Sequence, residues 1–273
     1  MLSSAGSVPA SLGERVHELA AERVRPMVAG EIPLLSVELP EPFRAVFTTR
    51  WDSPHLSEAR PFDLRDEAGC AARGILAGVL GCLAGGADPD PVLVSPQQVH
   101  GVRVAGAAEY MREGTKAPCD GLVVNPGLDA GLAALLVFAD CVPVILVGEV
   151  DAALVHGGWR GLLDGIVQQG AATMTGPPGL AVIGPSIGPC CYQVDSQLTA
   201  GFRRRFGSEI VPREGYLDLW EVATKAAGEV GVARQNVVNP RLCTMCNRDL
   251  FFSHRADGAG TGRHGAALWA TGV

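Results

Sequence analysis

The chain has 273 residues, of which 47% are hydrophobic and 19% are charged. This length and apolar content suffice to bury a full core, which excludes a disordered chain and a small scaffold that needs disulfides to fold. The formal net charge of −7 excludes a nucleic-acid partner, because no general cationic field would attract phosphates.

The N-terminus lacks the features of a secretory signal, and no apolar run is suited to crossing a membrane. Residues 1–6 offer neither a basic start nor an apolar stretch. The longest apolar stretch, residues 131–148, carries Asp140 and Pro143 near its middle. We therefore expect a cytoplasmic protein with no membrane partner, in which reducing conditions keep the eight Cys residues as free thiols.

Residues 1–42 are predicted to be an N-terminal extension that is partly helical. Ser11 can cap a helix over residues 12–28, because Glu14 three positions later completes a capping box. Repeated Gly and Pro residues between positions 26 and 42 interrupt the segment after that. The main domain is therefore expected to span residues 43–273.

From residue 43 onward the pattern predicts one α+β domain without internal repeats. Residues 43–49 alternate as a strand does. Short apolar runs typical of buried strands follow at residues 92–94, 121–124, 132–138, 142–147, 152–155 and 180–183. Helices are predicted over residues 67–83, 162–174, 195–206 and 219–230, and a last strand-like segment begins at Phe251.

Three of these apolar runs end in a side chain that can bind a metal. The three segments are Gln98-Val-His100-Gly, Ala139-Asp-Cys141 and Val155-His156-Gly-Gly. Strand ends at turns let a rigid sheet present ligands to a cleft. Two imidazoles and one thiolate suit Zn²⁺, and three protein ligands leave a fourth position open, as in catalytic zinc sites. The alternative for each residue alone is a buried core Cys or a hydrogen-bonded His.

Six motifs in this order resemble those of the YfiH family over residues 43–273. They are Gln98-Val-His-Gly, Cys119-Asp-Gly-Leu-Val, Ala139-Asp-Cys-Val-Pro, His156-Gly-Gly-Trp-Arg-Gly, Gly184-Pro-Ser-Ile-Gly-Pro-Cys-Cys-Tyr and Phe252-Ser-His-Arg…Thr261-Gly-Arg. Members of this family have been described as multicopper polyphenol oxidase (laccase) domains and later as purine nucleoside phosphorylases with adenosine deaminase activity.

The resemblance implies a fold, a metal site and a reaction. The implied fold is a four-layer α/β/β/α arrangement with mixed central sheets, similar to the catalytic domain of cytotoxic necrotizing factor. The family's zinc ligands match His100, Cys141 and His156. The implied activities are phosphorolysis of adenosine, inosine, guanosine and methylthioadenosine, and hydrolytic deamination of adenosine. The expected partners are purine nucleosides and phosphate, and the expected assembly is a monomer or a homodimer.

The chain departs from the family pattern mainly in its first motif. After Arg50 the family carries Gly-Gly-Val-Ser and later Asn-Leu-Gly, whereas this chain has Trp51-Asp-Ser-Pro and Phe62-Asp-Leu. The family's Asn-Arg pair appears as Ala72-Arg73. Milder changes are Cys119 for Ala before Asp-Gly, and Gly157 for Ala after His156. If the first motif binds phosphate or ribose, these changes alter substrate choice or activity.

Further residues are predicted to serve the chemistry. Asp120 or Asp140 would carry protons while zinc activates water for attack at C6 of adenine. Guanidinium groups bind oxyanions in a bidentate fork, and Gln98 is a further substrate-binding candidate. The candidate phosphate clamps, each of which has a structural ion pair as its alternative, are Arg50, Arg73, Arg160 and Arg263. Copper is not expected, because six His with no His-x-His pair cannot fill a multicopper centre.

Two other functions stay open. Cys141 with either His could form a thiolate–imidazole dyad, which would make the protein a metal-free cysteine hydrolase or amidase. The resemblance offers a matching role, because bacterial family members are implicated in editing peptidoglycan precursors. The altered first motif also allows a non-enzymatic partner protein.

The remaining thiols and one loop have no assigned role at this level. Cys243-Thr-Met-Cys246 is a lone C-x-x-C, which without a partner pair indicates core packing. Cys190 and Cys191 are either core residues or extra thiols near the pocket. The loop over residues 184–192 either wraps a substrate through its backbone N–H groups or is a tight structural turn.

Overall fold

Two six-stranded mixed sheets organise the chain in the computed structural model, which describes residues 23–53, 59–65, 69–85, 90–113 and 117–271. The first sheet runs in the order β1 (Val24–Ala29), β2 (Ile32–Val37), β3 (Phe43–Thr48), β12 (His264–Ala270), β7 (Leu132–Phe138) and β4 (Val92–Val94). The second runs β11 (Val237–Val238), β10 (Leu180–Ile183), β8 (Val142–Val147), β9 (Ala152–Gly157), β6 (Gly121–Val124) and β5 (Val104–Gly106). This is the mixed α+β class that the sequence predicts.

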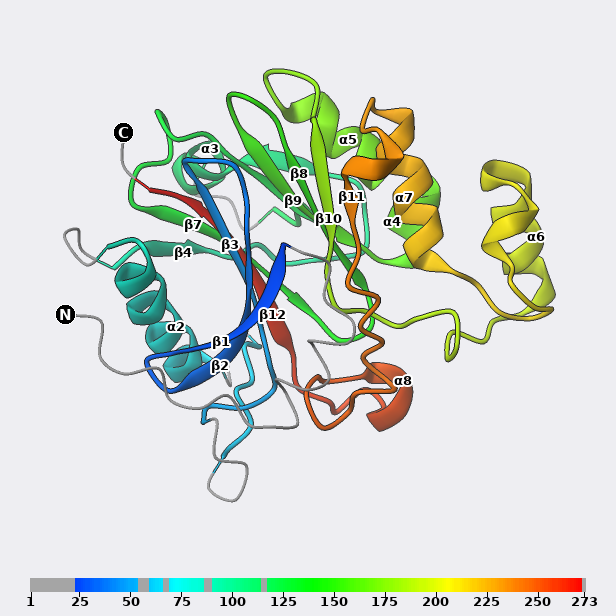
Figure 1. Ribbon diagram of the computed structural model, residues 1–273, viewed down its shortest axis with the longest axis horizontal. Helices are drawn as coiled ribbons and strands as arrows, with labels where there is room; N and C mark the ends of the chain where they lie inside the picture. Colours follow the sequence, from blue (N-terminus) through cyan, green and yellow to red (C-terminus); the bar gives the residue numbers. More distant parts are fainter. Residues whose placement is uncertain (1–22, 54–58, 66–68, 86–89, 114–116, 272–273) are drawn as a thin grey trace.

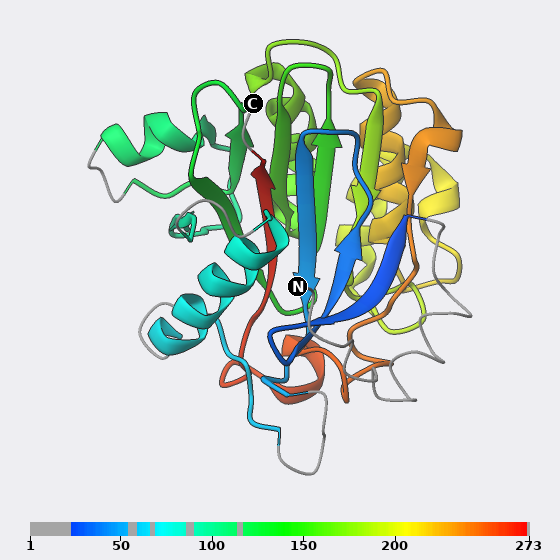
Figure 2. The ribbon, with the colours of Figure 1, turned by 60° about the vertical axis from the view of Figure 1, so that its left-hand side comes forward.

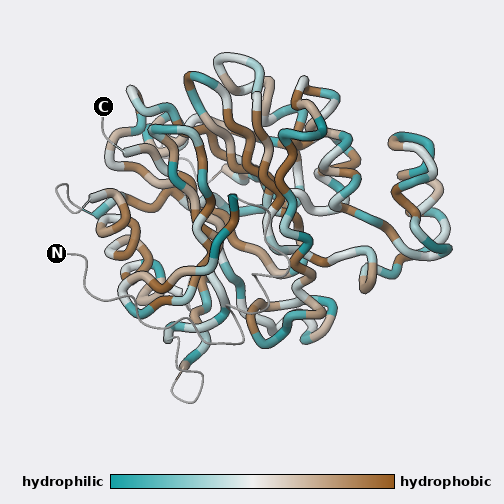
Figure 3. The backbone as a smooth tube through the Cα atoms, viewed as in Figure 1, coloured by the Kyte–Doolittle hydropathy of each residue, from teal (hydrophilic) through white to brown (hydrophobic). Residues whose placement is uncertain are grey.

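The central strands are largely apolar because each faces two cores. In β3, Phe43 and Phe47 point into a cluster shared with the second sheet, while Val46 points to the opposite side. In β8, Ile145 and Val147 enter the cluster between the sheets, while Val144 and Leu146 pack outward. Alternate side chains of a strand leave on opposite faces, so a strand that is covered on both faces needs apolar residues at every position. The brown strands at the centre of Figure 3 show this pattern.

Helices cover the outer face of each sheet (Figures 1 and 2). Helix α2 (Cys70–Leu83) buries Leu76 and Leu80 against Leu34 of the first sheet. The second sheet is covered by α4 (Trp159–Asp164), α5 (Ile166–Thr173) and α7 (Leu219–Glu229). Helix α6 (Ser196–Phe206) lies apart from the sheet, beyond α7, in Figure 1. The other short helices are α3 (Ala107–Arg112), η1 (Ser208–Ile210), η2 (Arg234–Asn236) and α8 (His254–Asp257). Within the described residues, none of these helices combines the length and apolarity needed to cross a bilayer.

The described part of the expected N-terminal extension belongs to the first sheet. Where a helix over residues 12–28 is expected, the chain from Val24 onward forms β1, which pairs with β2; the rest of that expected helix, up to residue 22, lies outside the described residues. Gly30 and Glu31 join the two strands with positive φ angles of 54° and 73°, as a two-residue hairpin turn requires. Of the Pro and Gly residues expected to interrupt this segment, Gly30 lies in the hairpin turn, Pro26 and Pro33 lie in β1 and β2, and Pro40 and Pro42 lie in the connection from β2 to β3.

Two further expectations are wrong in detail. The single helix expected over residues 162–174 is two helices, because Gly165 takes a left-handed φ of 96° between α4 and α5. The strand expected from Phe251 is absent from that segment of the described chain, where Phe251 and Phe252 are buried outside any strand. The last strand is β12, whose sequence His-Gly-Ala-Ala-Leu-Trp-Ala has no β-branched residue and therefore little local strand signal.

Candidate active site

His100, Cys141 and His156 meet at one end of the second sheet. Cys141 occupies the tight turn between β7 and β8. Two residues later, Pro143 of β8 pairs with His156 of β9, and this pairing brings the side chains of Cys141 and His156 together. His100 arrives from the loop that follows β4. One nitrogen or sulfur atom of each residue lies within 4.8 Å of the others. The fold therefore gathers all three residues that the sequence singles out.

A buried carboxylate holds this cluster in place. Asp120, at 0% exposure, accepts the backbone N–H groups of His100 and Gly101, both at 2.8 Å, and that of Val99 at 3.2 Å. The same carboxylate lies 3.0 Å from Nδ1 of His156. Burial opposes its charge, but the His156 hydrogen bond and the N–H donors outweigh burial and hold the pKa of Asp120 below its usual value. Asp120 thus fixes both the His100 loop and the ring of His156.

The cluster favours a thiolate. Burial raises the pKa of Cys141, but the two imidazoles outweigh it and lower that pKa to about 6. Burial lowers the pKa of His156, but the Cys141 thiolate and Asp120 outweigh it and raise that pKa to about 9. Because Asp120 engages Nδ1, Nε2 of His156 is the nitrogen available to the sulfur or to a metal. This is the carboxylate–histidine arrangement that orients metal-binding imidazoles in proteins.

Gly158 lets the chain pass close to two of these residues. A Cβ at this position would lie 2.7 Å from Cδ2 of His100 and 3.5 Å from Sγ of Cys141. The first distance is shorter than a carbon–carbon contact allows, so any larger residue would displace the imidazole. The Gly-Trp step of the motif is therefore needed for this approach.

A pocket of about 610 Å³ opens above the cluster. Its wall contains four of the other residues that the sequence singles out, namely Gln98, Asp140, Arg160 and Arg263. The remaining lining residues, besides the cluster itself, are Arg65, Pro96, Gln97, Val137, Ala139, Trp159, Tyr192, His254 and Arg255. Four guanidinium groups in the lining, those of Arg65, Arg160, Arg255 and Arg263, give the pocket a local positive character despite the negative net charge of the chain.

Two of the residues expected to clamp phosphate lie elsewhere. Arg50 donates to the carbonyl of Arg248 at 2.6 Å, and its guanidinium stacks over the rings of Trp51 and Phe252. Arg73 donates to the carbonyl of Leu64 at 3.0 and 2.8 Å. Neither of these Arg residues lines the pocket. The region of the altered first motif is thus built around structural arginines.

Two other expected site residues line the pocket but are already engaged. The amide of Gln98 pairs with both backbone groups of Val137, at 2.9 and 2.8 Å, and so fixes the end of β7. Asp140 has a left-handed φ of 89°, and its two oxygens accept from the Thr244 hydroxyl and the Arg255 N–H, both at 2.6 Å. A carboxylate has about four acceptor sites, so Asp140 can still accept a hydrogen bond from the pocket.

Sequence reasoning missed several lining residues. Arg255 donates to the carbonyl of Gln193 at 2.7 Å and stacks over Tyr192 with 5.2 Å between the guanidinium carbon and the ring centre. Burial raises the pKa of Tyr192 to about 12, so its hydroxyl stays protonated and can donate a hydrogen bond. Arg65 also faces the pocket, where Asp63 pairs with it at 2.6 Å. Arg255 lies inside the Ser-His-Arg motif, which is the signal that could have marked it.

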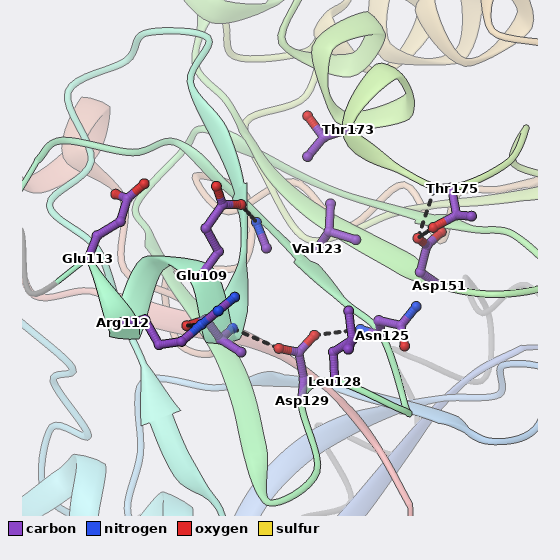
Figure 4. A pocket seen from close by; sticks show the side chains of 12 residues that line it. Glu109, Arg112, Glu113, Val123, Asn125, Leu128, Asp129, Asp151, Thr173 and Thr175 are labelled. Atoms are coloured by element: carbon purple, nitrogen blue, oxygen red, sulfur yellow. Dashed lines mark hydrogen bonds between the residues drawn. The ribbon is translucent and has the colours of Figure 1, made fainter.

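A second hollow, of about 560 Å³, lies between α3 and α5 away from the cluster (Figure 4). Two of its carboxylates fix loops. Asp129 accepts the N–H groups of Ala108 and Asn125 at 2.7 and 2.6 Å, and Asp151 accepts the N–H and hydroxyl of Thr175. The grouping of reactive side chains therefore selects the first pocket as the candidate active site.

Comparisons with known proteins agree on one family. The family model described as "Multi-copper polyphenol oxidoreductase laccase" matches residues 45–271. A Xylella fastidiosa protein named purine nucleoside phosphorylase is 30% identical over 84% of this chain and 94% of its own length. The crystal structure of the Bacillus licheniformis protein YfiH superposes with a TM-score of 0.72 at 26% identity, covering 89% of this chain and 98% of that one. A Neisseria meningitidis structure described by the DUF152 family has the same TM-score at 27% identity, covering 88% and 99%.

Proposed function

This chain belongs to the YfiH family of laccase-domain proteins, and on that premise we propose that it is a zinc-dependent purine nucleoside phosphorylase that also deaminates adenosine. The observation that carries the proposal is the convergence of His100, Cys141 and His156 beneath an arginine-lined pocket. The name of the Xylella relative supports the phosphorylase part. The α/β/β/α layer order and the likeness to cytotoxic necrotizing factor remain part of this proposal, as does a cytoplasmic location.

The donor set fits zinc better than copper centres. A lowered thiol pKa at Cys141 and an imidazole oriented by Asp120 are what a zinc ligand requires. Multicopper centres need many imidazoles, whereas in the described part of the chain only two His residues converge with other ligand atoms. Three protein donors leave one coordination position open. A zinc ion held there would supply a Lewis acid facing the pocket.

In phosphorolysis, phosphate attacks C1′ of the ribose, the C1′–N9 bond breaks, and the purine leaves with a proton. We assign phosphate binding to Arg160, Arg255 and Arg263, because their guanidinium groups line the pocket and form bidentate pairs with oxyanions. Burial lowers the pKa of Arg263, yet a guanidinium group stays charged at neutral pH. These three residues would hold phosphate, the nucleophile, on one side of the sugar.

In deamination, water adds at C6 of adenine and ammonia leaves, so protons must move from the water to the departing nitrogen. We assign this transfer to Asp140, which lines the pocket next to Cys141. Asp120 does not line the pocket and acts instead by orienting His156 and His100. Tyr192, which also lines the pocket, donates a hydrogen bond to the substrate.

A second function is favoured by one specific observation. The lowered pKa of Cys141 and the raised pKa of His156 describe a thiolate–imidazolium pair, which is also the machinery of a cysteine hydrolase. Such an enzyme would act without metal, for example on the amide bonds of a peptidoglycan precursor.

One incubation separates the functions. The purified protein is incubated with adenosine, with and without phosphate, and the products are identified. The phosphorylase releases adenine only with phosphate, and the deaminase forms inosine without it. His156→Ala should abolish both products, whereas Cys82→Ser, an exposed thiol on α2, should keep them.

Full activity after thorough chelation, combined with loss on thiol alkylation, would favour the cysteine hydrolase. Absence of turnover on the whole nucleoside panel, with zinc bound, would indicate a partner protein without enzymatic activity.

A further inference from the structure

Four cysteines outside the active-site cluster meet in space. Cys190 and Cys191 follow one another in the loop after β10, and Cys243 and Cys246 lie in the turn after β11. Sγ of Cys246 lies 3.5 Å from Sγ of both Cys190 and Cys191. All four sulfur atoms lie within 4.8 Å of one another. The C-x-x-C motif thus has a partner pair, which sequence spacing does not reveal.

The sulfur positions have the size of a tetrahedral metal site. A Zn–S bond of about 2.3 Å places the sulfurs of a ZnS₄ tetrahedron about 3.8 Å apart. Two of the sulfur pairs here are 3.5 Å apart and all of the separations are within 4.8 Å, which is compatible with that edge length. They are well beyond the roughly 2.05 Å of a disulfide bond.

The backbone fixes both halves of this cluster. The Ser186 N–H donates to the carbonyl of Leu242 at 3.1 Å, and the Thr244 N–H donates back to Ser186 at 3.0 Å. The Gly188 N–H points at Sγ of Cys243, 3.3 Å away. An N–H donor directed at sulfur stabilises a thiolate, which is the form that binds metal.

A positive side chain borders the cluster. Arg213 donates from its guanidinium to the carbonyl of Cys190 at 3.1 Å. Four thiolates around one Zn²⁺ carry a net charge of −2, and a neighbouring guanidinium offsets part of it. Because Cys190 and Cys246 are exposed, a metal can reach the site from solvent.

We propose that Cys190, Cys191, Cys243 and Cys246 bind one structural zinc ion. Four protein ligands leave no open position, so this ion would be structural, unlike one held by His100, Cys141 and His156. It cross-links the loop over residues 184–192 to the Cys243–Cys246 turn. The same two segments hold Asp140, because Thr244 donates to its carboxylate and the Ile187 N–H donates to its carbonyl at 2.9 Å. The zinc ion would therefore brace one wall of the pocket.

The test is to purify the full-length protein in the presence of a reductant and to measure its zinc content by elemental mass spectrometry. Cys246→Ser should contain one zinc equivalent per chain less than the wild type. Cys82→Ser, an exposed thiol outside both clusters, should match the wild type. The test compares the zinc content of Cys246→Ser with that of the wild type. Its result therefore does not depend on whether the active-site cluster also binds zinc.

A second variant guards against loss of metal through misfolding. Cys246→His restores a nitrogen ligand, and a Cys₃His set also binds zinc, so this variant should regain the lost equivalent. Replacement of zinc by Co²⁺ should give a sulfur-to-cobalt absorption band that weakens strongly in Cys246→Ser. Equal zinc content in Cys246→Ser and the wild type would overturn the proposal. So would a freshly purified, metal-free protein in which these cysteines are joined as disulfides.

Discussion

Asp120→Asn tests whether the buried carboxylate tunes the metal site or only supports the fold. Asn has nearly the same shape but replaces one oxygen with an NH₂ donor. Oδ1 faces two donors, the His100 N–H and Nδ1 of His156, so the amide oxygen is expected there. The NH₂ group then faces the Gly101 N–H, which donates to Oδ2 at 2.8 Å in the wild type.

The magnitude follows from what this substitution removes. One hydrogen bond to a charged acceptor contributes about 1.5–3 kcal/mol, and a buried donor without a partner costs about 1–3 kcal/mol more. We therefore expect the free energy of unfolding to fall by roughly 3–5 kcal/mol. A neutral amide also polarises His156 less than a carboxylate does. Loss of such an orienting partner lowers metal affinity about 10–100-fold.

Asp129→Asn is the matched control. Asp129 is 4% exposed and also accepts two backbone N–H groups, but it borders the other hollow. Unfolding in urea should show a loss of stability in both variants. Competition with a chromophoric zinc chelator, in a Cys246→Ser background that leaves one site, should show weaker binding only for Asp120→Asn. Unchanged zinc affinity with a stability loss like that of Asp129→Asn would refute the tuning role.

The stability difference between the wild type and Asp120→Asn should depend on pH. The folded-state pKa of Asp120 lies below its usual value, because the His156 hydrogen bond and N–H donors outweigh burial. Its stabilising contribution is therefore present above the unfolded value of about 3.9 and disappears as the pH falls through the lower folded value. The stability gap between wild type and Asp120→Asn should accordingly narrow in strong acid. It should also narrow as the pH rises toward 9, because Asp120 helps to raise the pKa of His156 to about 9 and that stabilisation is lost when His156 loses its proton. A gap that narrows between pH 5 and 7 would contradict this account.

Three further predictions concern the cluster and the pocket wall. Gly158→Ala would place its Cβ 2.7 Å from Cδ2 of His100, so the affinity for zinc should fall about tenfold or more. The control Gly176→Ala, whose Cβ would have no atom within 4 Å, should leave the zinc affinity unchanged, and equal affinities in the two variants would refute the steric argument. The alkylation rate of Cys141 in metal-stripped protein, followed by peptide mass spectrometry, should reach half its maximum near pH 6, because the two imidazoles stabilise the thiolate. Bound zinc should protect Cys141 from alkylation, and a midpoint above pH 8 would contradict the thiolate assignment. Arg263→Lys should raise the KM for phosphate about tenfold, because Lys lacks the bidentate fork of a guanidinium group. Arg50→Lys, which changes a residue outside the pocket, should leave this KM unchanged, and the reverse result would identify Arg50 as the phosphate clamp.

Much of the fold was predictable because the buried strands are long apolar runs. The strands β3, β4, β6, β7, β8 and β10 agree closely with their predicted ranges. The missed strands are β1, β2, β5, β11 and β12. Strands β5 and β11 have only three and two residues, and the other three contain Pro, Gly or Ala, whose local preference opposes a strand. Pairing within the sheet overrides that preference. In β12, for example, Ala267 lies between Val46 of β3 and Leu135 of β7.

The sequence by itself determined which side chains can carry chemistry. Cys141 and His156 lie at strand ends and His100 lies in the loop after β4, and the local pattern of apolar runs followed by these residues was enough to select them. Only the tertiary structure decided which residues meet. Strand pairing makes Asp120 an orienting group for His156, leaves Arg50 and Arg73 outside the pocket, and brings Arg255 into it. It also joins Cys190 and Cys191 to a C-x-x-C motif more than fifty positions away. The physical reason is that local periodicity records how buried a segment is, whereas the identity of its neighbour depends on long-range pairing and packing.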